Sequence, residues 1–276
     1  MKNVVILYHA HCPDGFGAAW AARKKFKERA EYIPVQHNTP LPEGLSGKEI
    51  YILDFCYPKE VMEELLSKNK KVVAIDHHIS QKAIITALPF YVFDLDHSGA
   101  VLAWKYFHHG KRTPKLLRHI EDIDLWSFKL PHTREIILAL RMRGYDFKIW
   151  DRIAPCLEET KKRRQYVKEG TILLAFQRTI LEDLAVRADK VIFEGFPALA
   201  VNSSVFNSEL GNLLVKKGVP IGIVWRVQNN KTIVSLRSDG KTDVCAPAQK
   251  YGGGGHKAAS SFTLAKGTPL PWKIKQ

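Results

Sequence analysis

The chain has 276 residues, is 45% hydrophobic and carries a formal net charge of +14, which argues against a disordered chain and favours a polyanionic partner. No apolar run approaches the roughly 18 residues that cross a bilayer and no signal peptide is recognisable, so we expect a cytoplasmic protein without a membrane partner. The four cysteines are scattered, which argues against a zinc knuckle of closely paired thiols and indicates reduced side chains.

Strand-like and helix-like segments alternate along the first 110 residues. Apolar runs predict strands at 4–8, 49–54, 71–76 and 90–94, and helices near 15–29, 58–69 and 98–109. This alternation is typical of parallel βαβ units with right-handed crossovers. The sequence therefore predicts an N-terminal domain, residues 1–156, built on a doubly wound parallel sheet, with residues 114–155 mostly helical.

An amphipathic stretch at 157–189 predicts a helical linker to a second domain at 190–276. Further strands are expected at 191–196, 198–201, 221–227, 232–236 and 260–264, with a helix at 205–216. This second domain holds 12 Lys and Arg against four acids, so more than half of the net positive charge lies there. The fold class is thus α/β, with a smaller α/β domain following the parallel-sheet domain.

Metal-capable side chains follow each of the first four predicted strands. The first strand runs into His9, His11 and Asp14, and the others end at Asp54, at Asp76-His77-His78 and at Asp94. In an open parallel sheet the carboxyl ends of the strands share one edge, where such folds bind ligands. The pattern predicts a metal centre at that edge.

A glycine-rich segment near the C-terminus predicts an anion site. Four consecutive glycines, 252–255, precede His256 and Lys257, and such turns let backbone N–H groups cradle phosphate oxygens. A flexible surface loop is the alternative explanation. Upstream, Arg237 and Ser238 lie at the end of a predicted strand, and an arginine there suits a phosphate or a base.

Together these segments resemble the DHH phosphoesterase family with a C-terminal DHHA1 domain. The resemblance rests on His9 to Gly15, Asp54, Asp76-His77-His78, Asp94–Ala100, Ser235–Ser238 and Gly252–Ser260, which follow in the family's order over nearly the whole chain. It implies an N-terminal lobe that holds two divalent ions, usually manganese, and a DHHA1 lobe that binds substrate.

The resemblance also implies a role for each matching residue. Asp54 would bridge both ions, His78 would act on the scissile phosphate, and Asp76 would orient the histidines. The remaining ligands would be His9 for one ion and Asp14, His77 and Asp94 for the other. The substrate would be held by Arg237, Ser238, Gly253, Gly254, Gly255, His256 and Lys257. This donor set suits two Mn²⁺ ions, with Mg²⁺ or Co²⁺ as substitutes, which would activate a water for attack.

The first motif departs from the family's usual Asp-x-Asp, because Cys12 takes the place of the first acid and His11 lies beside it. The first ion is then held by His9 and His11, bound loosely, or absent. Two other acidic segments receive no ligand role: Asp96 is expected to cap a helix, and Asp122 and Asp124 are expected to begin one.

The predicted function is metal-dependent hydrolysis of short single-stranded RNA or DNA by an exonuclease or phosphodiesterase. Other phosphate substrates stay open, namely 3′-phosphoadenosine phosphate, cyclic or linear dinucleotides and polyphosphate. A hypothesis of another class is a nucleic-acid-binding protein without catalysis, which hydrolysis of any phosphodiester would exclude. The sequence also leaves open a homodimer.

Overall fold

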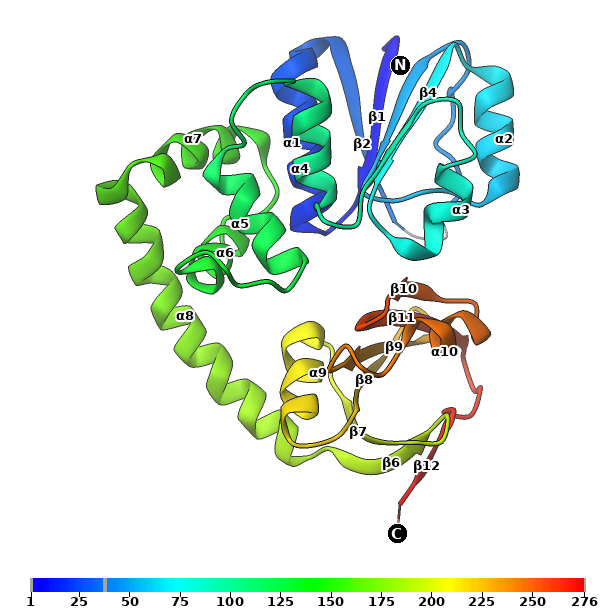
Figure 1. The fold of residues 1–276 in the computed structure, drawn as a ribbon, viewed down its shortest axis with the longest axis vertical. Helices are drawn as coiled ribbons and strands as arrows, with labels where there is room; N and C mark the ends of the chain where they lie inside the picture. Colours follow the sequence, from blue (N-terminus) through cyan, green and yellow to red (C-terminus); the bar gives the residue numbers. More distant parts are fainter. Residues whose placement is uncertain (1, 37–38, 276) are drawn as a thin grey trace. The chain divides into compact units, whose positions relative to one another are not determined.

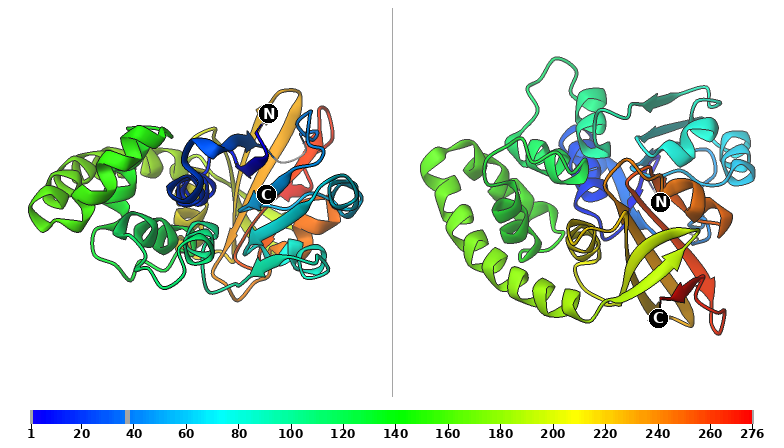
Figure 2. Two further views of the ribbon diagram at one scale, coloured as in Figure 1. Left: turned by 90° about the horizontal axis from the view of Figure 1, so that it is seen from above. Right: turned by 60° about the horizontal axis from the view of Figure 1, so that its bottom comes forward.

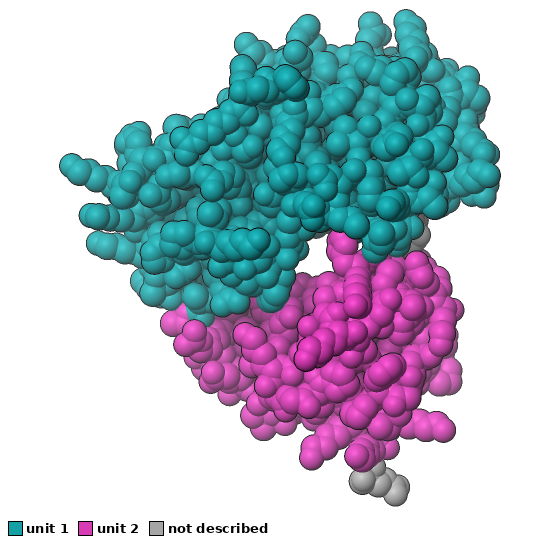
Figure 3. All heavy atoms as spheres, in the orientation of Figure 1, with its two compact units in different colours: residues 1–174 teal, residues 175–276 magenta. Residues whose placement is uncertain are grey.

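The chain divides into two compact units, residues 1–174 and 175–276 (Figure 3). The structure is a computed structural model, and it describes residues 2–36 and 39–275. Over these two ranges, no helix has the length and apolar character needed to cross a membrane. Each unit is built on its own sheet, and the metal-capable side chains of the N-terminal motifs all lie in the first unit.

The first unit contains a five-stranded sheet in the order β2-β1-β3-β4-β5, in which all neighbouring strands are parallel. The strands are β1 (Val4–His9), β2 (Ala30–Val35), β3 (Glu49–Leu53), β4 (Lys71–Asp76) and β5 (Tyr91–Phe93). The chain passes from β1 to β2 on one side and then to β3 on the other. The strand order therefore reverses between β1 and β3, and such a switch point opens a crevice at the carboxyl ends of the strands.

Helices cover both faces of this sheet, because successive strand residues point to opposite sides. Val5 and Leu7 of β1 face the side covered by α2 (Lys59–Lys68) and α3 (Lys82–Ile85). Ile6 and Tyr8 face the side covered by α1 (Pro13–Phe26) and α4 (Gly99–Phe107) (Figure 1). The doubly wound parallel sheet predicted from the sequence is confirmed.

Four more helices complete the first unit, beside the short 3₁₀ turns at Lys27–Arg29 and Ile79–Gln81. They are α5 (Lys115–Asp124), α6 (Thr133–Arg141), α7 (Phe147–Glu158) and the first half of α8 (Thr160–Val186). Helix α8 is a continuous helix of 27 residues (Figure 2). Tyr166 and Val167 of α8 pack on the first unit's core, whereas Leu181 and Leu184 pack on a core of the second unit.

The second unit contains a seven-stranded mixed sheet in the order β10-β11-β9-β8-β7-β6-β12. Its strands are β6 (Asp189–Phe193), β7 (Phe196–Asn202), β8 (Ile221–Gln228), β9 (Lys231–Ser238), β10 (Gly254–His256), β11 (Ala259–Ala265) and β12 (Trp272–Ile274). Strands β7 and β8 pair parallel and the other pairs are antiparallel. Helix α9 (Asn207–Lys216) packs with the end of α8 on one face, and α10 (Cys245–Lys250) packs on the other. The predicted second α/β unit is thus confirmed.

Candidate metal centre

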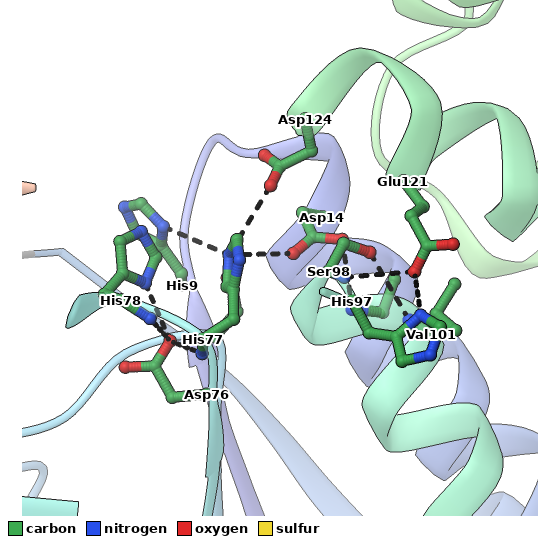
Figure 4. Close-up of polar contacts among 12 residues, drawn as sticks. His9, Asp14, Asp76, His77, His78, His97, Ser98, Val101, Glu121 and Asp124 are labelled. Carbon is green, nitrogen blue, oxygen red and sulfur yellow. Dashed lines mark hydrogen bonds and ion pairs between the residues drawn. The ribbon is translucent and has the colours of Figure 1, made fainter. Parts of the chain in front are cut away.

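His77, which directly follows β4, lies at the centre of a group of carboxylates. Its Nε2 atom lies 3.4 Å from Oδ1 of Asp54, 3.4 Å from Oδ2 of Asp124 and 3.7 Å from Oδ2 of Asp14. Asp54 follows β3, Asp14 lies in the first turn of α1, and Asp124 is the last residue of α5. Figure 4 shows His77 between Asp14 and Asp124. The neighbouring ends of β3 and β4 and two helix termini thus converge on one imidazole.

A second group of ligand atoms adjoins the first through Asp54. Oδ2 of Asp54 lies 3.4 Å from Nδ1 of His9, the last residue of β1. The sulfur of Cys12 joins His9 and Asp54 in a group whose ligand atoms lie within 4.8 Å of one another. The group of Asp14, His77 and Asp124 meets the same criterion. Asp54 therefore lies between two sets of potential metal ligands, across the switch point of the sheet.

Two carboxylates at this edge, those of Asp14 and Asp54, are buried, and their nearest ionic partners among the described residues are the imidazoles of His77 and His9. Asp14 and Asp54 are each 1% exposed. Within the described part of the chain, neither oxygen of Asp54 accepts a hydrogen bond, nor does Oδ2 of Asp14. Because buried carboxylates that are only partly compensated by neighbouring imidazoles are costly, these oxygens call for a further cation. The donor set of carboxylates, imidazoles and one thiol fits divalent metal ions.

Gly99, the first residue of α4, allows the two carboxylates to lie this close together. A Cβ atom at Gly99 would lie 2.8 Å from Oδ1 of Asp54 and 3.0 Å from Oδ2 of Asp14. The other oxygen of Asp14 accepts a hydrogen bond from the N–H of Ala100 at 3.0 Å. Asp54 itself has a φ of 64°, a left-handed backbone that is rare outside glycine and is often found at functional sites.

The ionisation of the cluster reflects its crowded negative charge. Burial raises the pKa of Asp14 well above its ordinary value, and the charges of Asp54 and Asp124 add to this. Burial opposes ionisation of Asp54 too, but the imidazoles of His77 and His9 hold its pKa well below the usual range. Burial would lower the pKa of His77, yet the carboxylates around it raise that pKa to about 10. Protons on Asp14 and His77 thus offset the repulsion between the carboxylates, and a bound cation would displace these protons.

Asp76 holds His78 in one orientation. Its Oδ1 atom accepts hydrogen bonds from the N–H of His77 at 2.7 Å and of His78 at 3.3 Å, and lies 2.7 Å from Nδ1 of His78 (Figure 4). Because this oxygen is already an acceptor, Nδ1 of His78 carries the hydrogen and Nε2 is the ring's acceptor. Burial disfavours the charged form of His78, but Asp76 raises its pKa.

Glu121 ties helix α5 to the start of α4, one turn before Asp124. Its Oε2 atom accepts a hydrogen bond from the N–H of Ser98 at 3.1 Å and lies 3.0 Å from Nδ1 of His97 (Figure 4). Ser98 caps α4 and directly precedes Gly99. The link therefore fixes the position of Asp124 relative to the start of α4, the segment that packs on Asp14 and Asp54.

Two residues predicted as ligands lie outside these groups. His11 is exposed, and its carbonyl accepts a hydrogen bond from the hydroxyl of Tyr145 at 3.4 Å. Oδ1 of Asp94 accepts a hydrogen bond from the N–H of Asp96 at 2.9 Å. Among the residues that the structure describes, no group of converging ligand atoms contains His11 or Asp94.

Asp124 is the residue in this cluster that the sequence analysis missed, because it was expected to begin a helix and instead ends one. One signal could have identified it. The negative end of a helix dipole disfavours an acid in the last turn, so an aspartate there needs another reason to be present. Proximity to a cationic group is such a reason.

In the second unit, Arg237 and His256 point to the same face of the sheet. Arg237 of β9 is paired with Ala259 of β11, and Ala259 is paired with His256 of β10, and directly opposed residues share a face. The guanidinium of Arg237 donates to the carbonyl of Leu236 and to the hydroxyl of Ser208. Burial lowers its pKa to about 10, so it remains charged at neutral pH.

The glycine run is an ordered β-hairpin. Gly254, Gly255 and His256 form β10, which pairs with β11. A Cβ atom at Gly253 would lie 2.0 Å from the carbonyl oxygen of Ser261, and Gly255 has a φ of +138°. Glycine is therefore required for the close approach of these two backbones, and the alternative of a flexible loop is wrong. Lys257 is exposed at the turn, whereas the hydroxyl of Ser238 donates to the carbonyl of Thr242 at 2.6 Å.

Comparisons with known proteins agree with this architecture. Residues 192–271 match the family model of the DHHA1 domain. An uncharacterized protein, R106, of Acanthamoeba polyphaga mimivirus is 31% identical over 292 residues, which cover 95% of this chain and 67% of the viral protein.

Solved structures share the fold over nearly the whole chain. An exopolyphosphatase-related protein from Bacteroides fragilis has a TM-score of 0.58 at 13% identity and covers 95% of this chain and 87% of its own. RecJ from Thermus thermophilus, in complex with Mn²⁺, has a TM-score of 0.53 at 18% identity and covers 95% of this chain and 49% of its own. With Asp76-His77-His78 at the edge of a parallel sheet and a DHHA1 domain after it, the chain belongs to the DHH family of phosphoesterases, hydrolases of phosphoester bonds.

Proposed function

We propose that this chain is a Mn²⁺-dependent exonuclease that hydrolyses short single-stranded oligonucleotides from one end. The observation that carries the proposal is the convergence of Asp14, Asp54, His77 and Asp124 at the switch point of the sheet, with buried carboxylate oxygens that lack hydrogen bonds. Imidazole donors beside the carboxylates favour a borderline ion such as Mn²⁺ over Mg²⁺ or Ca²⁺.

The ligand groups suggest how the chain's residues share the work. Asp14, His77 and Asp124 would hold one ion, His9 and Cys12 would hold the other, and Asp54 would contact both. Divalent ions at such a site lower the pKa of water and neutralise charge on the phosphate. Asp76 holds the Nδ1 side of the His78 ring, so Nε2 would be the atom that acts on the substrate. Because Asp76 also raises the pKa of His78, the ring can take up a second proton on Nε2, and the protonated ring would donate that proton to the leaving oxygen.

The second unit supplies the features that favour an oligonucleotide. Arg237 and His256 share a face of the sheet and together suit a terminal phosphate. The excess of Lys and Arg over residues 190–276 favours a substrate with several phosphates. A chain end held by these groups would be cut one nucleotide at a time.

The test is a product ladder from end-labelled RNA and DNA strands of two to about twenty nucleotides, incubated with Mn²⁺ and after chelation. We expect stepwise shortening from one end, faster on the shorter strands, and no activity on circular single strands. Asp54→Asn, purified in parallel, should be folded and inactive, which excludes a contaminating nuclease. Arg237→Ala should raise KM far more than it lowers kcat, because it removes binding common to ground and transition states.

The same assay separates the alternatives. The panel includes 3′-phosphoadenosine phosphate, linear and cyclic dinucleotides and polyphosphate, and a clear preference for one of these would replace the oligonucleotide as substrate. Internal cuts would exclude the end-binding mechanism. Tight binding of oligonucleotides with no hydrolysis of any substrate at saturating Mn²⁺ would show a binding protein instead.

A further inference from the structure

A cavity of about 510 Å³ opens in the first unit at the carboxyl ends of β1 and β2. Its aromatic walls are formed by Tyr8, Phe16 and Tyr145, and Pro34, Gln36 and His11 contribute to its rim. This volume is in the range of pockets that hold small ligands. Among the described residues that line it there is no Lys, Arg, Asp or Glu. The cavity therefore suits a flat, neutral group rather than a phosphate.

The cavity adjoins the candidate metal centre through one short segment. Ala10 and His11 line the cavity, while His9 before them and Cys12 after them belong to a ligand group of the metal centre. Adjacent Cα atoms are only about 3.8 Å apart, so the cavity wall begins where the metal ligands end. The cavity and the metal centre therefore share one segment of four residues, which places them side by side for a single substrate.

The aromatic walls are held rigidly. The Phe16 ring stacks on Phe147 with centroids 4.6 Å apart and meets the edge of Trp150 at 4.7 Å. Tyr145 lies 5.5 Å from Phe16. Phe16 and Tyr8 are buried behind Tyr145 as support, and Tyr145, which is 40% exposed, offers the ring on which a planar group can stack. Base stacking on such a ring is sequence-tolerant. Gln36 at the rim offers an amide donor and an acceptor, the pair that the edge of a base requires.

His11 joins the cavity to the metal centre with an unusual backbone. Its φ of 57° is left-handed, and its carbonyl is held by the hydroxyl of Tyr145. This conformation turns the chain between His9 and Cys12. Ala10 and His11 line the cavity, whereas His9 and Cys12 belong to a ligand group of the metal centre. A strained residue at such a position indicates a functional constraint.

We infer that this cavity is a base-binding subsite, which takes the nucleobase of the nucleotide next to the scissile phosphate. The inference rests on the proposed hydrolysis of oligonucleotides and adds where a base is bound. It assigns Tyr145 and Gln36, which are not metal ligands, a part in substrate selection, and it gives the His11 side chain a place beside the base.

The test compares intact dinucleotides with dinucleotides that are abasic at one or the other position. The variants are Tyr145→Ala and Gln36→Ala, with Tyr106→Ala as a matched control, because Tyr106 is 38% exposed and Tyr145 is 40% exposed. In the wild type, removal of one of the two bases should lower kcat/KM by roughly tenfold or more. Tyr145→Ala should bring the ratio of kcat/KM for the intact dinucleotide to kcat/KM for the abasic dinucleotide closer to one. Tyr106→Ala should leave this ratio unchanged. A ratio that Tyr145→Ala does not alter overturns the inference.

A binding measurement separates this inference from the proposed function. His78→Ala, which keeps every proposed metal ligand, is loaded with Mn²⁺ and titrated with the intact and the abasic dinucleotides, with and without Tyr145→Ala in the same chain. The heat of binding is recorded. The subsite is supported if Tyr145→Ala weakens the affinity for the intact dinucleotide but not for the abasic one. This result would stand even if the wild type hydrolyses neither compound. Equal affinities for intact and abasic dinucleotides overturn the subsite, even if hydrolysis is observed.

Discussion

Oδ2 of Asp124 lies 3.4 Å from Nε2 of His77, although the two residues come from different elements, the end of α5 and the end of β4. This contact completes a ligand group with Asp14. In contrast, the carboxylate of Asp94 accepts a hydrogen bond from the backbone of its own loop. The two aspartates therefore make a matched pair for testing which acid binds metal.

Asp124→Asn should weaken Mn²⁺ binding by roughly a hundredfold, since even groups that only orient ligands are worth about 10- to 100-fold. Asp94→Asn should change the Mn²⁺ affinity little. The measurement is calorimetric titration of each variant with Mn²⁺, beside thermal unfolding as a control for folding. The reverse result, a loss confined to Asp94→Asn, would restore Asp94 as the ligand.

Asp76→Asn should lower kcat while leaving the Mn²⁺ concentration for half activity nearly unchanged. The amide keeps an oxygen acceptor for the contacts that Oδ1 of Asp76 makes, but it removes the negative charge that raises the pKa of His78 and strengthens the contact to its Nδ1. We expect a loss of roughly 10- to 100-fold, and a larger loss, about 10²- to 10⁴-fold, for His78→Ala. If saturating Mn²⁺ restores either variant, the residue acts through the metal and not on the phosphate.

Cys12→Ala should raise the Mn²⁺ concentration needed for half activity, because the thiol lies in the ligand group of His9 and Asp54. His11→Ala should leave that concentration unchanged, because His11 lies in the neighbouring cavity wall. A thiolate prefers softer metals, so Cd²⁺ should bind the wild type more tightly than Cys12→Ala, as followed by cadmium–thiolate absorbance. A metal requirement that only His11→Ala changes would reverse this assignment.

The stability of the first unit should fall in mild acid because of His119. This residue is 5% exposed, its Nδ1 lies 2.9 Å from the hydroxyl of Thr133, and burial lowers its pKa to about 4. In the unfolded chain the pKa is about 6.5, so protonation favours unfolding. The stability that neutral His119 provides is complete above pH 6.5 and is lost as the pH falls toward 4, by about 3 kcal/mol in all.

The check is urea unfolding between pH 7.5 and 4 of the wild type and of His119→Asn, whose amide can donate as Nδ1 does. Other groups titrate over the same range, so the informative quantity is the difference between the two pH profiles. If the two profiles are parallel, the pKa of His119 is the same in the folded and the unfolded chain, and His119 does not cause the loss of stability in acid.

The sequence predicted the layers of both units well but missed edge strands, among them β2 of the first sheet and β10 of the second. Strand β2 was not expected, because Pro34 interrupts the run Ala30–Val35. The strand lies at the edge of the sheet, where a proline without an N–H is tolerated. Strand β10 was likewise not predicted, since glycine is a poor strand former and only its pairing with β11 makes it one.

The order of the strands explains why Asp94 was predicted as a metal ligand and Asp124 was not. All predicted strands end at one edge, but the sequence does not reveal which strands are neighbours. In the sheet, β5 lies two places from β3, which is about 10 Å at the usual strand spacing. Asp94 follows β5 and is therefore far from Asp54 along the edge. The acid beside His77 comes instead from the end of α5, a helix whose path no local pattern in the sequence specifies.

Helix α8 leaves no loop at which the two units could be separated for study. Tyr166 and Val167 near its start complete one core, and Leu181 and Leu184 near its end complete another. A fragment that stops at residue 156 would lack Tyr166 and Val167 and expose the first core to solvent. A fragment that starts at residue 190 would lack Leu181 and Leu184 and expose the second. A usable division has to fall inside the helix, near residue 174, and each half then needs a capping residue for the backbone groups that the cut exposes.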